Sequence, residues 1–572
     1  MITRQAVFRP SSWLADVSVM ALLAALLYGV VRVGRHWQAP LQPLVDIDLR
    51  LWALPGYTLL SLLRGVAAYG VSLGLALAYG YTAAHRPRAE RLLLPLLDVL
   101  QSIPVLGFLP GAVLVLVALF PHTNAGLELA SILMIVTSQV WNLAFSFYQS
   151  LRGIPLELRE ASRVYQFNWW QCFRRVELPA AAVGLAWNSM MAMAGGWFFL
   201  MVCESFTLGS HDFRLPGLGA YMSAAINQRD TRAIVAGLAA MVVMITLVDL
   251  CVWRPVLVWV QKFRIEETSA GSRRETLLLR WLRHSWLARS AMATVAHPIS
   301  EWLATATHPP HEPSARPSAA RGAARAARVL GWFGAALGGL LVMWAAVRLV
   351  RLLVGLSLAE WLDVLSGSAL TCVRVSAAVL LGSLWVIPVG IWIGRSEQWR
   401  SRLQPLVQIA ASFPAPMLYP LILLTLHALG WGLGVGAVLF MLIGTQWYIL
   451  FNVLAGVSAV PTELREAAQA YRFTSGQWWR VVWWPAMFPY LITGWVTAAG
   501  GAWNASIVAE YVSVGPQVSV TKGLGSLISL AASQGRYDVL SAGVLTMAVL
   551  VVLINRCLWK PLYRLAETRY AL

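Results

Sequence analysis

Long apolar stretches recur along the whole chain, separated by short polar segments. A helix needs about 20 mostly apolar residues to cross roughly 30 Å of hydrocarbon, and most of the stretches approach or exceed that length. They run over residues 15–34, 57–84, 101–120, 127–150, 180–205, 233–260, 329–354, 367–394, 410–429, 432–454, 486–510 and 540–558. The pattern predicts an all-α polytopic membrane protein with about twelve transmembrane helices.

The second half of the chain repeats the first. The segment from Pro155 to Ala180 matches that from Pro461 to Ala486 at an offset of 461 − 155 = 306, and upstream residues match at an offset of 310. Each half holds about six of the apolar stretches. Because that number is even, both halves enter the membrane the same way up, and the sequence predicts two parallel homologous halves with a substrate pathway between them.

The repeat divides the chain into three parts. Residues 1–260 form the first half, 261–328 a polar connection, and 329–572 the second half. Within the connection, 273–289 alternates leucine and tryptophan with arginine, which is typical of an amphipathic helix lying on a membrane surface. Residues 308–328 are rich in proline, alanine and arginine, a composition that favours a flexible tether. A plain fusion linker is the alternative for the whole segment.

Composition narrows the function classes. The chain is 58% hydrophobic and 12% charged, which excludes a soluble globular protein. Its formal net charge of +18 is explained by arginines in cytoplasmic loops, so a nucleic-acid partner is not expected. That arginine distribution predicts cytoplasmic termini and a cytoplasmic linker. The five cysteines lack metal-binding or disulfide spacing, so no metal site is predicted.

A short charged motif occurs once in each half, between the fourth and fifth stretches. It reads Pro-x-Glu-Leu-Arg-Glu-Ala from Pro155 and again from Pro461, with aromatic residues, arginine and a closing proline downstream. Proline at the start and acidic residues in the first turn favour a short helix. The sequence therefore predicts two equivalent helices that project from the membrane and present charges to a partner.

These residues resemble the EAA loop of binding-protein-dependent permeases, the membrane subunits of ATP-binding-cassette importers. Together with the paired Gly-Leu-Gly segments at Gly217 and Gly523, they resemble the nitrate, sulfonate, taurine and bicarbonate branch and its fused tandem permease. The resemblance implies a MetI-like permease fold in a bacterial inner membrane. It also implies that each EAA helix docks onto one of two ATPase subunits through the residues Glu157, Arg159, Glu160, Ala161, Ser162, Glu463, Arg465, Glu466, Ala467 and Ala468.

The sequence departs from the family pattern at one position of the motif. The family commonly has glycine four residues after the last residue of the EAA triplet, whereas this chain has Gln166 and Arg472 there. Glycine at that position permits a tight turn between two short helices. Its replacement predicts a differently shaped coupling helix and leaves open which ATPases pair with it.

The chain carries no recognisable ATPase. A P-loop needs GxxxxGK[ST], and Lys262, Lys522 and Lys560 are the chain's lysines, none in that context. We therefore expect no catalytic residue and no cofactor bound by this chain, with ATP and magnesium held by the partner ATPase. Whether a periplasmic substrate-binding protein also takes part stays open.

Polar residues inside the apolar stretches are candidates for the translocation pathway. Ionisable groups within a membrane are costly and often functional, so an anion-attracting role for the arginines is one reading, and snorkelling or local pairing is the other. For the tryptophan and asparagine residues the alternative is helix packing, and for the carboxylates it is ion pairing. The candidates are Arg64, Arg374, Asn188, Trp197, Trp503, Asn504, Glu204 and Glu510.

The duplicated motif favours an importer permease, not an enzyme, that moves a small anion inward. A secondary carrier built of parallel six-span halves is the main alternative, and it would lack the docking helices. A permease for a non-anionic solute is another. A membrane-embedded enzyme finds no support, because no nucleophile or His/Glu cluster recurs within the spans.

Overall fold

The computed structural model describes residues 45–102, 105–208, 211–263, 346–514 and 517–569, together with isolated residues before 45 and between 339 and 344. The chain divides into two compact units. The first comprises residues 1–28, 146–187 and 253–356, and the second comprises 29–145, 188–252 and 357–572. The predictions for residues 15–34, for most of 329–354 and for the linker beyond Phe263 lie outside the described residues.

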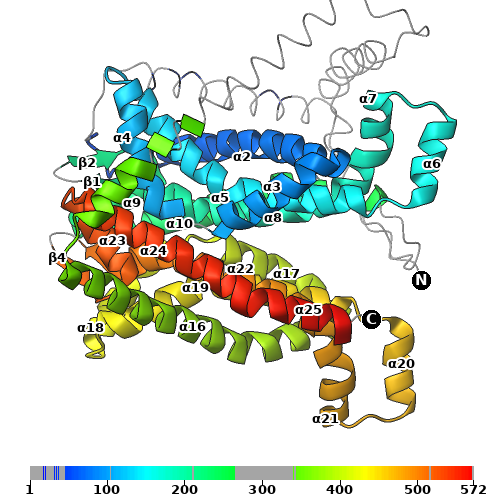
Figure 1. Ribbon diagram of the computed structural model, residues 1–572. Helices are drawn as coiled ribbons and strands as arrows, with labels where there is room; N and C mark the ends of the chain where they lie inside the picture. The colour runs from blue at the N-terminus through cyan, green and yellow to red at the C-terminus, as the bar shows by residue number, and fades with distance from the viewer. Residues whose placement is uncertain are drawn as a thin grey trace, which may run out of the picture. The chain divides into compact units, whose positions relative to one another are not determined.

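Helices dominate the described part of the chain (Figure 1). In the first repeat the elements are η1 (Leu51–Ala53), α2 (Leu54–His85), α3 (Pro87–Ser102), η2 (Val105–Phe108), α4 (Leu109–Leu119), α5 (Ala125–Arg152), α6 (Leu156–Val164), α7 (Trp169–Cys172), η3 (Phe173–Glu177), α8 (Leu178–Cys203), β1 (Ser205–Leu208), β2 (His211–Arg214), α9 (Leu218–Asn227), α10 (Thr231–Val248), η4 (Asp249–Trp253), α11 (Arg254–Val260) and η5 (Gln261–Phe263).

The second repeat follows the same order of elements. It contains α16 (Leu358–Gly394), α17 (Glu397–Ser412), η7 (Ala415–Leu418), α18 (Tyr419–Ala428), α19 (Leu433–Ser458), α20 (Thr462–Ala470), α21 (Ser475–Gln477), η8 (Trp478–Trp483), α22 (Trp484–Ala509), β3 (Tyr511–Val514), β4 (Gln517–Val520), α23 (Leu524–Ser533), α24 (Tyr537–Ile554), η9 (Asn555–Trp559) and α25 (Lys560–Arg569). The prediction of a helical protein made of two homologous halves is confirmed.

Seven helices within the described ranges are long and apolar enough to cross a membrane, or eight if one bent pair is counted as a span. Large apolar side chains are exposed on these helices, as on a surface that faces lipid. Leu384 on α16, for example, is 73% exposed. The helices satisfy their own backbone hydrogen bonds, as a spanning segment must.

Two of the predicted spans are not single helices. The stretch 101–120 splits into α3, η2 and α4, and α4 has 11 residues, a rise of about 16 Å that is too short to cross alone. The stretch 410–429 splits in the same way, and its two helical parts are bent by 80°. Proline explains the break, since Phe413 before Pro414 is extended with ψ 126°, the conformation that a following proline imposes.

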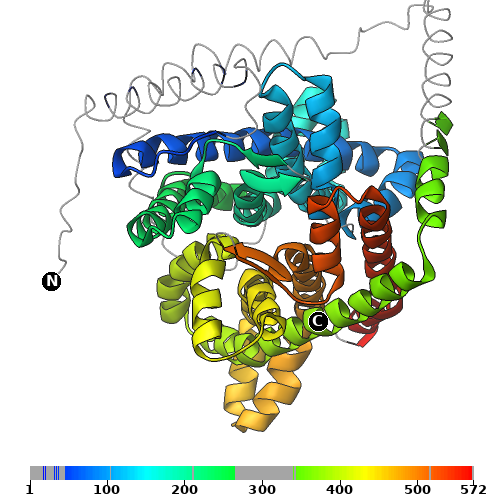
Figure 2. The same cartoon turned by 90° about the vertical axis from the view of Figure 1, so that its left-hand side faces the viewer.

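In the second unit, α19 packs between α16 and α22 (Figure 2). Glycines on α16 allow the close approach to α19. A Cβ atom added at Gly390 would lie 2.5 Å from a methyl of Val453, and one at Gly394 would lie 2.8 Å from a methyl of Val457. This four-residue spacing of small residues is a common device for packing helices in a membrane.

Each repeat also contains a β-hairpin that the sequence analysis did not predict. The hairpin β1–β2 pairs Phe206 with Phe213, whose rings stack 5.2 Å apart, and β3–β4 pairs Val512 with Ser519. Each hairpin follows directly on a long helix and leads into the Gly-Leu-Gly segment of its repeat. The hairpins therefore fix where those segments lie.

The two repeats keep the same backbone even where their residues differ. Arg229, just after α9, is left-handed with φ 55°, and its repeat counterpart Gly535 is left-handed with φ 68°. Glycine adopts this conformation without steric cost, whereas a residue with a Cβ does not. Backbone hydrogen bonds from Arg229 N to Ile226 O at 3.1 Å and from Asp230 N to Ala225 O at 3.0 Å close the turn that glycine forms in the other half.

Candidate functional site

The duplicated motif forms a projecting pair of short helices in each repeat. In the first unit α6 begins after Pro155. A capping box starts α7: Asn168 Oδ1 accepts from the backbone nitrogen of Gln171 at 2.7 Å. In the second unit α20 begins after Pro461, and Thr474 makes the equivalent capping box at α21. The two views in Figures 1 and 2 show α20 and α21 projecting beyond the ends of α19 and α22.

The arginine of the motif ties each projecting helix to the span before it. Arg159 Nη2 donates to the carbonyl oxygen of Leu151 at 2.6 Å, and Arg465 Nη2 donates to that of Val457 at 2.5 Å. The pKa of Arg465 is lowered by its partial burial and by the positive charge of Arg400. Both arginines therefore serve to orient the helices.

The other motif residues divide into an exposed and an inward-facing set. Exposed side chains offer carboxylates to a partner, whereas buried ones pack the helix against its own unit. The exposed acidic residues are Glu157, Glu160, Glu463 and Glu466; Ser162 and Ala468 are buried, Ala161 is half-buried and Ala467 is exposed.

The exposed face of α6 is more apolar than that of α20. Leu156 and Val164 are 65% and 78% exposed, whereas Tyr165 and its counterpart Tyr471 are alike at 73% and 79%. The repeat counterparts of Leu156 and Val164 are Thr462 and Ala470. Both helices expose acidic groups, but α6 also exposes more apolar surface than α20.

Both repeats form a tight turn at the position where the family pattern has glycine. Gln166 and Arg472 adopt left-handed conformations, with φ 51° and φ 50°. Phe167 N donates to Ser162 O, and Phe473 N donates to Ala468 O, each at 3.0 Å, which closes the same tight turn in both repeats. The backbone thus accepts a non-glycine residue at a turn that glycine would form more easily.

The first pair of charged pathway candidates forms a buried cluster in the second unit. Arg64 binds Glu128 through two hydrogen bonds of 2.8 Å each and also pairs with Glu204. Ser61 Oγ donates to Glu204 at 2.6 Å, and Gly219 N at the start of α9 donates to it at 2.7 Å. The guanidinium and both carboxylates are at most 4% exposed, so this cluster is shielded from solvent.

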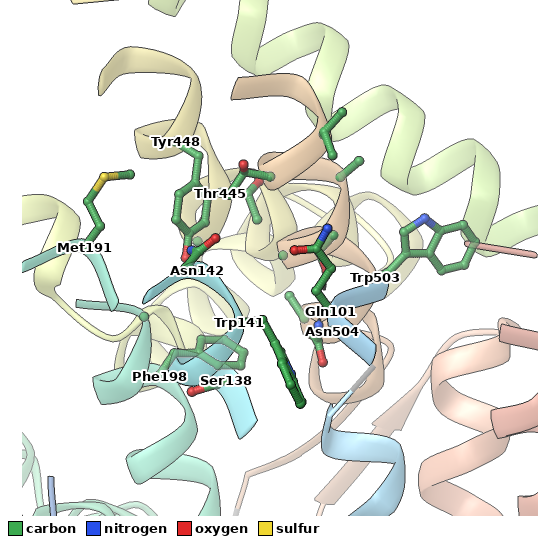
Figure 3. Close-up of a pocket in the computed structure, with 18 of the residues that line it drawn as sticks. Gln101, Ser138, Trp141, Asn142, Met191, Phe198, Thr445, Tyr448, Trp503 and Asn504 are labelled. Carbon is green, nitrogen blue, oxygen red and sulfur yellow. Dashed lines mark hydrogen bonds between the residues drawn. The ribbon is translucent and has the colours of Figure 1, made fainter. Parts of the chain in front are cut away.

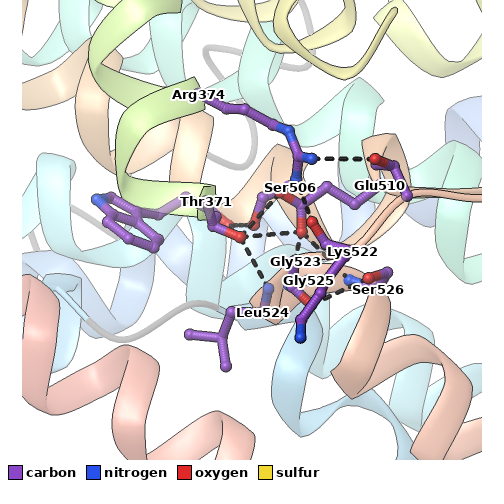
Figure 4. Close-up of polar contacts among 11 residues, drawn as sticks. Thr371, Arg374, Ser506, Glu510, Lys522, Gly523, Leu524, Gly525 and Ser526 are labelled. Carbon is purple, nitrogen blue, oxygen red and sulfur yellow. Dashed lines mark hydrogen bonds and ion pairs between the residues drawn. The ribbon is translucent and has the colours of Figure 1, made fainter. Parts of the chain in front are cut away.

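The second pair repeats this arrangement (Figure 4). Arg374 Nη1 lies 2.7 Å from Glu510 Oε1, and the other carboxylate oxygen accepts from Gly525 N at 2.9 Å. Thr371, the counterpart of Ser61, donates to Glu510 at 2.8 Å and accepts from Leu524 N at 2.8 Å. A carboxylate at the amino end of a helix is stabilised by the unpaired backbone N–H groups there.

The Gly-Leu-Gly segments belong to these clusters. A Cβ atom at Gly217 would overlap the carboxylate of Glu204, and one at Gly523 would overlap that of Glu510. Glycine is therefore required because the carboxylate lies directly against the backbone. In each repeat, the arginine, the carboxylate and the glycine together join the end of a long helix to the start of a short one. These helices are α8 and α9 in the first repeat, and α22 and α23 in the second.

The two clusters differ in one residue. Glu128 corresponds to Gly434 in the second repeat, since 128 + 306 = 434. A Cβ atom at Gly434 would lie 3.8 Å from Arg374 Nη2, at ordinary contact distance. Arg64 thus has two carboxylates, whereas among the described residues Arg374 pairs with Glu510 alone.

A cavity of about 300 Å³ lies in the second unit, between helices of the two repeats. Its size is at the lower end of small-molecule sites. Figure 3 shows aromatic and amide side chains from α5, α8, α19 and α22 converging on it, and none of the residues that line it is charged. The lining includes Gln101, Ser138, Trp141, Asn142, Phe145, Met191, Phe198, Thr445, Tyr448, Thr497, Trp503 and Asn504.

Only some of the predicted pathway residues line this cavity. Trp503 and Asn504 do, and Asn504 Oδ1 accepts from Val105 N of the other repeat at 2.7 Å. Trp197 is 2% exposed and packs against Gly65, and Asn188 is half-buried outside the lining. The four charged candidates lie in the buried clusters. Sequence reasoning missed Gln101, Ser138, Asn142 and Thr445, single polar residues whose direction is decided by packing.

Within the described ranges, no group of three or more His, Cys, Asp or Glu side chains has a metal-binding arrangement. All five cysteines are free, with Cys203 buried and Cys251 exposed. The polar groups that line the cavity are amides, hydroxyls and indoles, which can bind a ligand by hydrogen bonds.

Comparison with known proteins gives a consistent result for both repeats. A family model described as "Binding-protein-dependent transport system inner membrane component" matches residues 70–254 and 386–558. The chain is 32% identical over 185 residues to a putative ABC transporter permease of Methanocaldococcus jannaschii, and 27% identical over 194 residues to a putative aliphatic sulfonates transport permease of Bacillus subtilis. These alignments cover 32% and 34% of this chain, and 65% of the length of each relative. A solved chain of the MetNI methionine ABC transporter in an inward-facing form is similar at 21% identity and a TM-score of 0.32, over 37% of this chain and 99% of that one.

Proposed function

Because the chain belongs to the family of binding-protein-dependent transport system inner membrane components, with the family domain present twice, we propose that it is the permease of an ATP-driven importer for a small anion. A transport permease is not an enzyme. ATP hydrolysis would then come from two separate ATPase subunits that hold ATP and magnesium. The substrate would be delivered by a periplasmic binding protein and would move inward.

The observation that carries this proposal is the pair of projecting helices α6 and α20. Each is oriented by an arginine tie to its own span, and each leaves the carboxylates of the motif exposed. A secondary carrier is driven by an ion gradient and needs no docking helices for an ATPase. We therefore assign Glu157, Glu160, Glu463 and Glu466 to ATPase docking, and Arg159 and Arg465 to holding the helices in place.

The apolar face of α6 supports the same role. Leu156 and Val164 on this face are 65% and 78% exposed. A partner that covers them would gain from burying apolar surface, roughly 25 cal/mol per Å². Docking at α6 would accordingly be tighter than at α20.

We assign the translocation pathway to the uncharged cavity. Trp503 and Asn504 line it, whereas Arg64 and Arg374 already have carboxylate partners and lie outside the lining. An ion pair within a low-dielectric interior is held by its own Coulombic attraction. The arginines would then act on the fold of each half, and the substrate would meet amides and hydroxyls.

The orientation is proposed from the arginine distribution. Both termini, the linker 261–328 and the helices α6 and α20 would face the cytoplasm of a cell with an inner membrane, in keeping with the positive-inside rule. Ala315→Cys, placed in the linker of an otherwise cysteine-free chain, should react only after the membrane is permeabilised. Labelling of intact cells by an outside-only thiol reagent would contradict the orientation.

The anion assignment draws on relatives named for what they transport. These include a bicarbonate permease of Synechococcus elongatus, a nitrate permease of Synechocystis sp. and the permease of Escherichia coli for taurine, which carries a sulfonate group. A neutral solute is the second candidate, because the cavity lining is uncharged and one relative is named as a trimethylamine N-oxide permease.

Uptake separates the two candidates. The chain, copurified with its ATPase and reconstituted in vesicles with the cognate binding protein, should take up sulfonates, nitrate or bicarbonate in preference to uncharged solutes of the same size. The rate should depend on ATP supplied on the side of α6 and α20. Transport of trimethylamine N-oxide alone would replace the anion assignment and leave the permease assignment in place.

A further inference from the structure

The cavity lies on the pseudo-two-fold axis, the line about which a half-turn relates one repeat to the other. Most of its lining positions come in repeat-equivalent pairs, at offsets of 306 or 310 residues. Such pairs include Ser138 and Gly444, Trp141 and Trp447, Phe145 and Phe451, Gly195 and Gly501, and Phe198 and Asn504. Because the two halves are parallel, this axis runs along the membrane normal, the direction in which a solute crosses.

A side chain on such an axis meets its own counterpart from the other repeat. Protein interiors are close-packed, so two large side chains would compete there for one space. The lining pair Asn142 and Tyr448 differs in this way, since only the second repeat has a ring at this position. Figure 3 shows the Tyr448 side chain directed from α19 into the cavity. Asn142, on α5, is shorter and exposed.

Two equivalent glycines lie against the Tyr448 side chain. A Cβ atom added at Gly195 on α8 would lie 3.3 Å from Tyr448 Oη, and one added at Gly501 on α22 would lie 3.3 Å from Tyr448 Cε2. Both distances are shorter than the roughly 3.5–4.0 Å of an ordinary contact, so the ring needs the bare backbone of both helices. The side chain therefore extends from α19 of the second repeat to α8 of the first, across the axis.

The ring is held by packing and not by a hydrogen bond. Among the described residues, Tyr448 Oη has no hydrogen-bond partner, and the backbone oxygen of Tyr448 accepts from Asn452 Nδ2 at 2.8 Å. A side chain without a tie at its far end can change between staggered rotamers once the helices around it move apart.

We propose that Tyr448 is the seal of the translocation pathway. Its ring closes the axis between α8 and α22 while the permease is at rest, and a solute passes only when the ring swings away. One ring is sufficient because it lies on the axis, which explains why the first repeat has the smaller Asn142. This inference rests on the proposed permease function. The seal acts on the size of what passes and not on its charge.

Passive leak tests the seal. The chain, copurified with its ATPase and reconstituted in vesicles without ATP, should pass neither xylitol nor potassium nitrate, the latter with a potassium ionophore present. Stopped-flow light scattering measures both. Tyr448→Asn, which introduces the residue of the first repeat, should speed the leak by about ten-fold or more, equivalent to about 1.4 kcal/mol in the barrier.

Three further variants separate sealing from general packing. Tyr448→Phe keeps the ring and should leave the leak slow. Asn142→Tyr combined with Tyr448→Asn moves the ring to the equivalent position of the other repeat and should restore the seal. Tyr537→Asn makes the same exchange at an exposed tyrosine outside the cavity lining, and it should leak no faster than the unmodified complex. Copurification of the ATPase shows that each variant has folded and assembled.

Three results would overturn the proposal. The first is a Tyr448→Asn complex that leaks no faster than the unmodified one, and the second is a Tyr448→Phe complex that leaks as fast as Tyr448→Asn. The third is a double variant that also leaks as fast, because the leak would then come from lost packing within the second repeat. The permease role would stand in every case, since ATP-driven uptake and ATPase association test it independently.

Discussion

Replacing Glu510 by Gln is expected to lower the free energy of unfolding by about 3–5 kcal/mol, the cost of leaving a buried charge without its partner. Arg374 would lose its opposite charge and keep neutral acceptors such as Thr521 Oγ1 at 3.0 Å and the Lys522 carbonyl at 2.8 Å. Glu204→Gln should cost less, because Arg64 retains its two bonds to Glu128. Thermal and denaturant unfolding of the purified chain in one detergent would give both values.

The chain supplies a control and a rescue for this comparison. Asp363 pairs with Lys522 at 3.0 Å, but both side chains are more than half exposed, so Asp363→Asn should cost less than about 1 kcal/mol. Gly434→Glu brings a carboxylate toward Arg374, as Glu128 does for Arg64, and should restore part of the stability of Glu510→Gln. Equal destabilisation by Glu204→Gln and Glu510→Gln would refute this view of the two clusters.

The second large effect is expected at the projecting helices. Glu160→Ala combined with Glu466→Ala should abolish stable association with the ATPase, because truncating one partner of a buried hydrogen-bonded charge pair costs about 2–5 kcal/mol. Both carboxylates are exposed in the chain alone, so its own unfolding should hardly change. Copurification of the ATPase at matched expression measures the loss.

Further variants test whether the ATPase binds α6 more tightly than α20. Leu156→Thr with Val164→Ala gives α6 the residues of α20 at these two positions, and it should weaken copurification further in a Glu466→Ala background. Asp363→Ala, an exposed carboxylate far from the motif in sequence, should copurify the ATPase normally. Wild-type association of the double glutamate variant would remove the motif from the docking role.

The sequence predicted much of the fold because the evidence for it is local or repeated. An apolar stretch of spanning length is a helix wherever it lies in a membrane, and the offset of 306 residues exposed the duplication without any knowledge of contacts. The cost of a lone charge in a membrane predicted that a pathway arginine would be paired with its substrate or with a carboxylate, and in the structure Arg64 pairs with Glu204 and Arg374 with Glu510.

Other features depend on contacts between distant segments. Glu128 was not singled out because its counterpart is Gly434, so the repeat gives no sign of it. The break between α17 and α18 follows from Pro414, but prolines also occur inside α16 and α22 without ending them. The cavity residues Gln101, Asn142 and Thr445 look like isolated polar positions until packing turns them toward one another. Comparing polarity at repeat-equivalent positions would have found Gln101 and Thr497.

The central claim is that a separate ATPase drives this permease through α6 and α20, and the energy source of uptake tests it most directly. In vesicles containing the chain, its ATPase and the binding protein, the anion should be taken up only with hydrolysable ATP on the side of these helices. A proton or sodium gradient alone should drive none. Uptake driven by an ion gradient in the absence of ATP would contradict the account and indicate a secondary carrier.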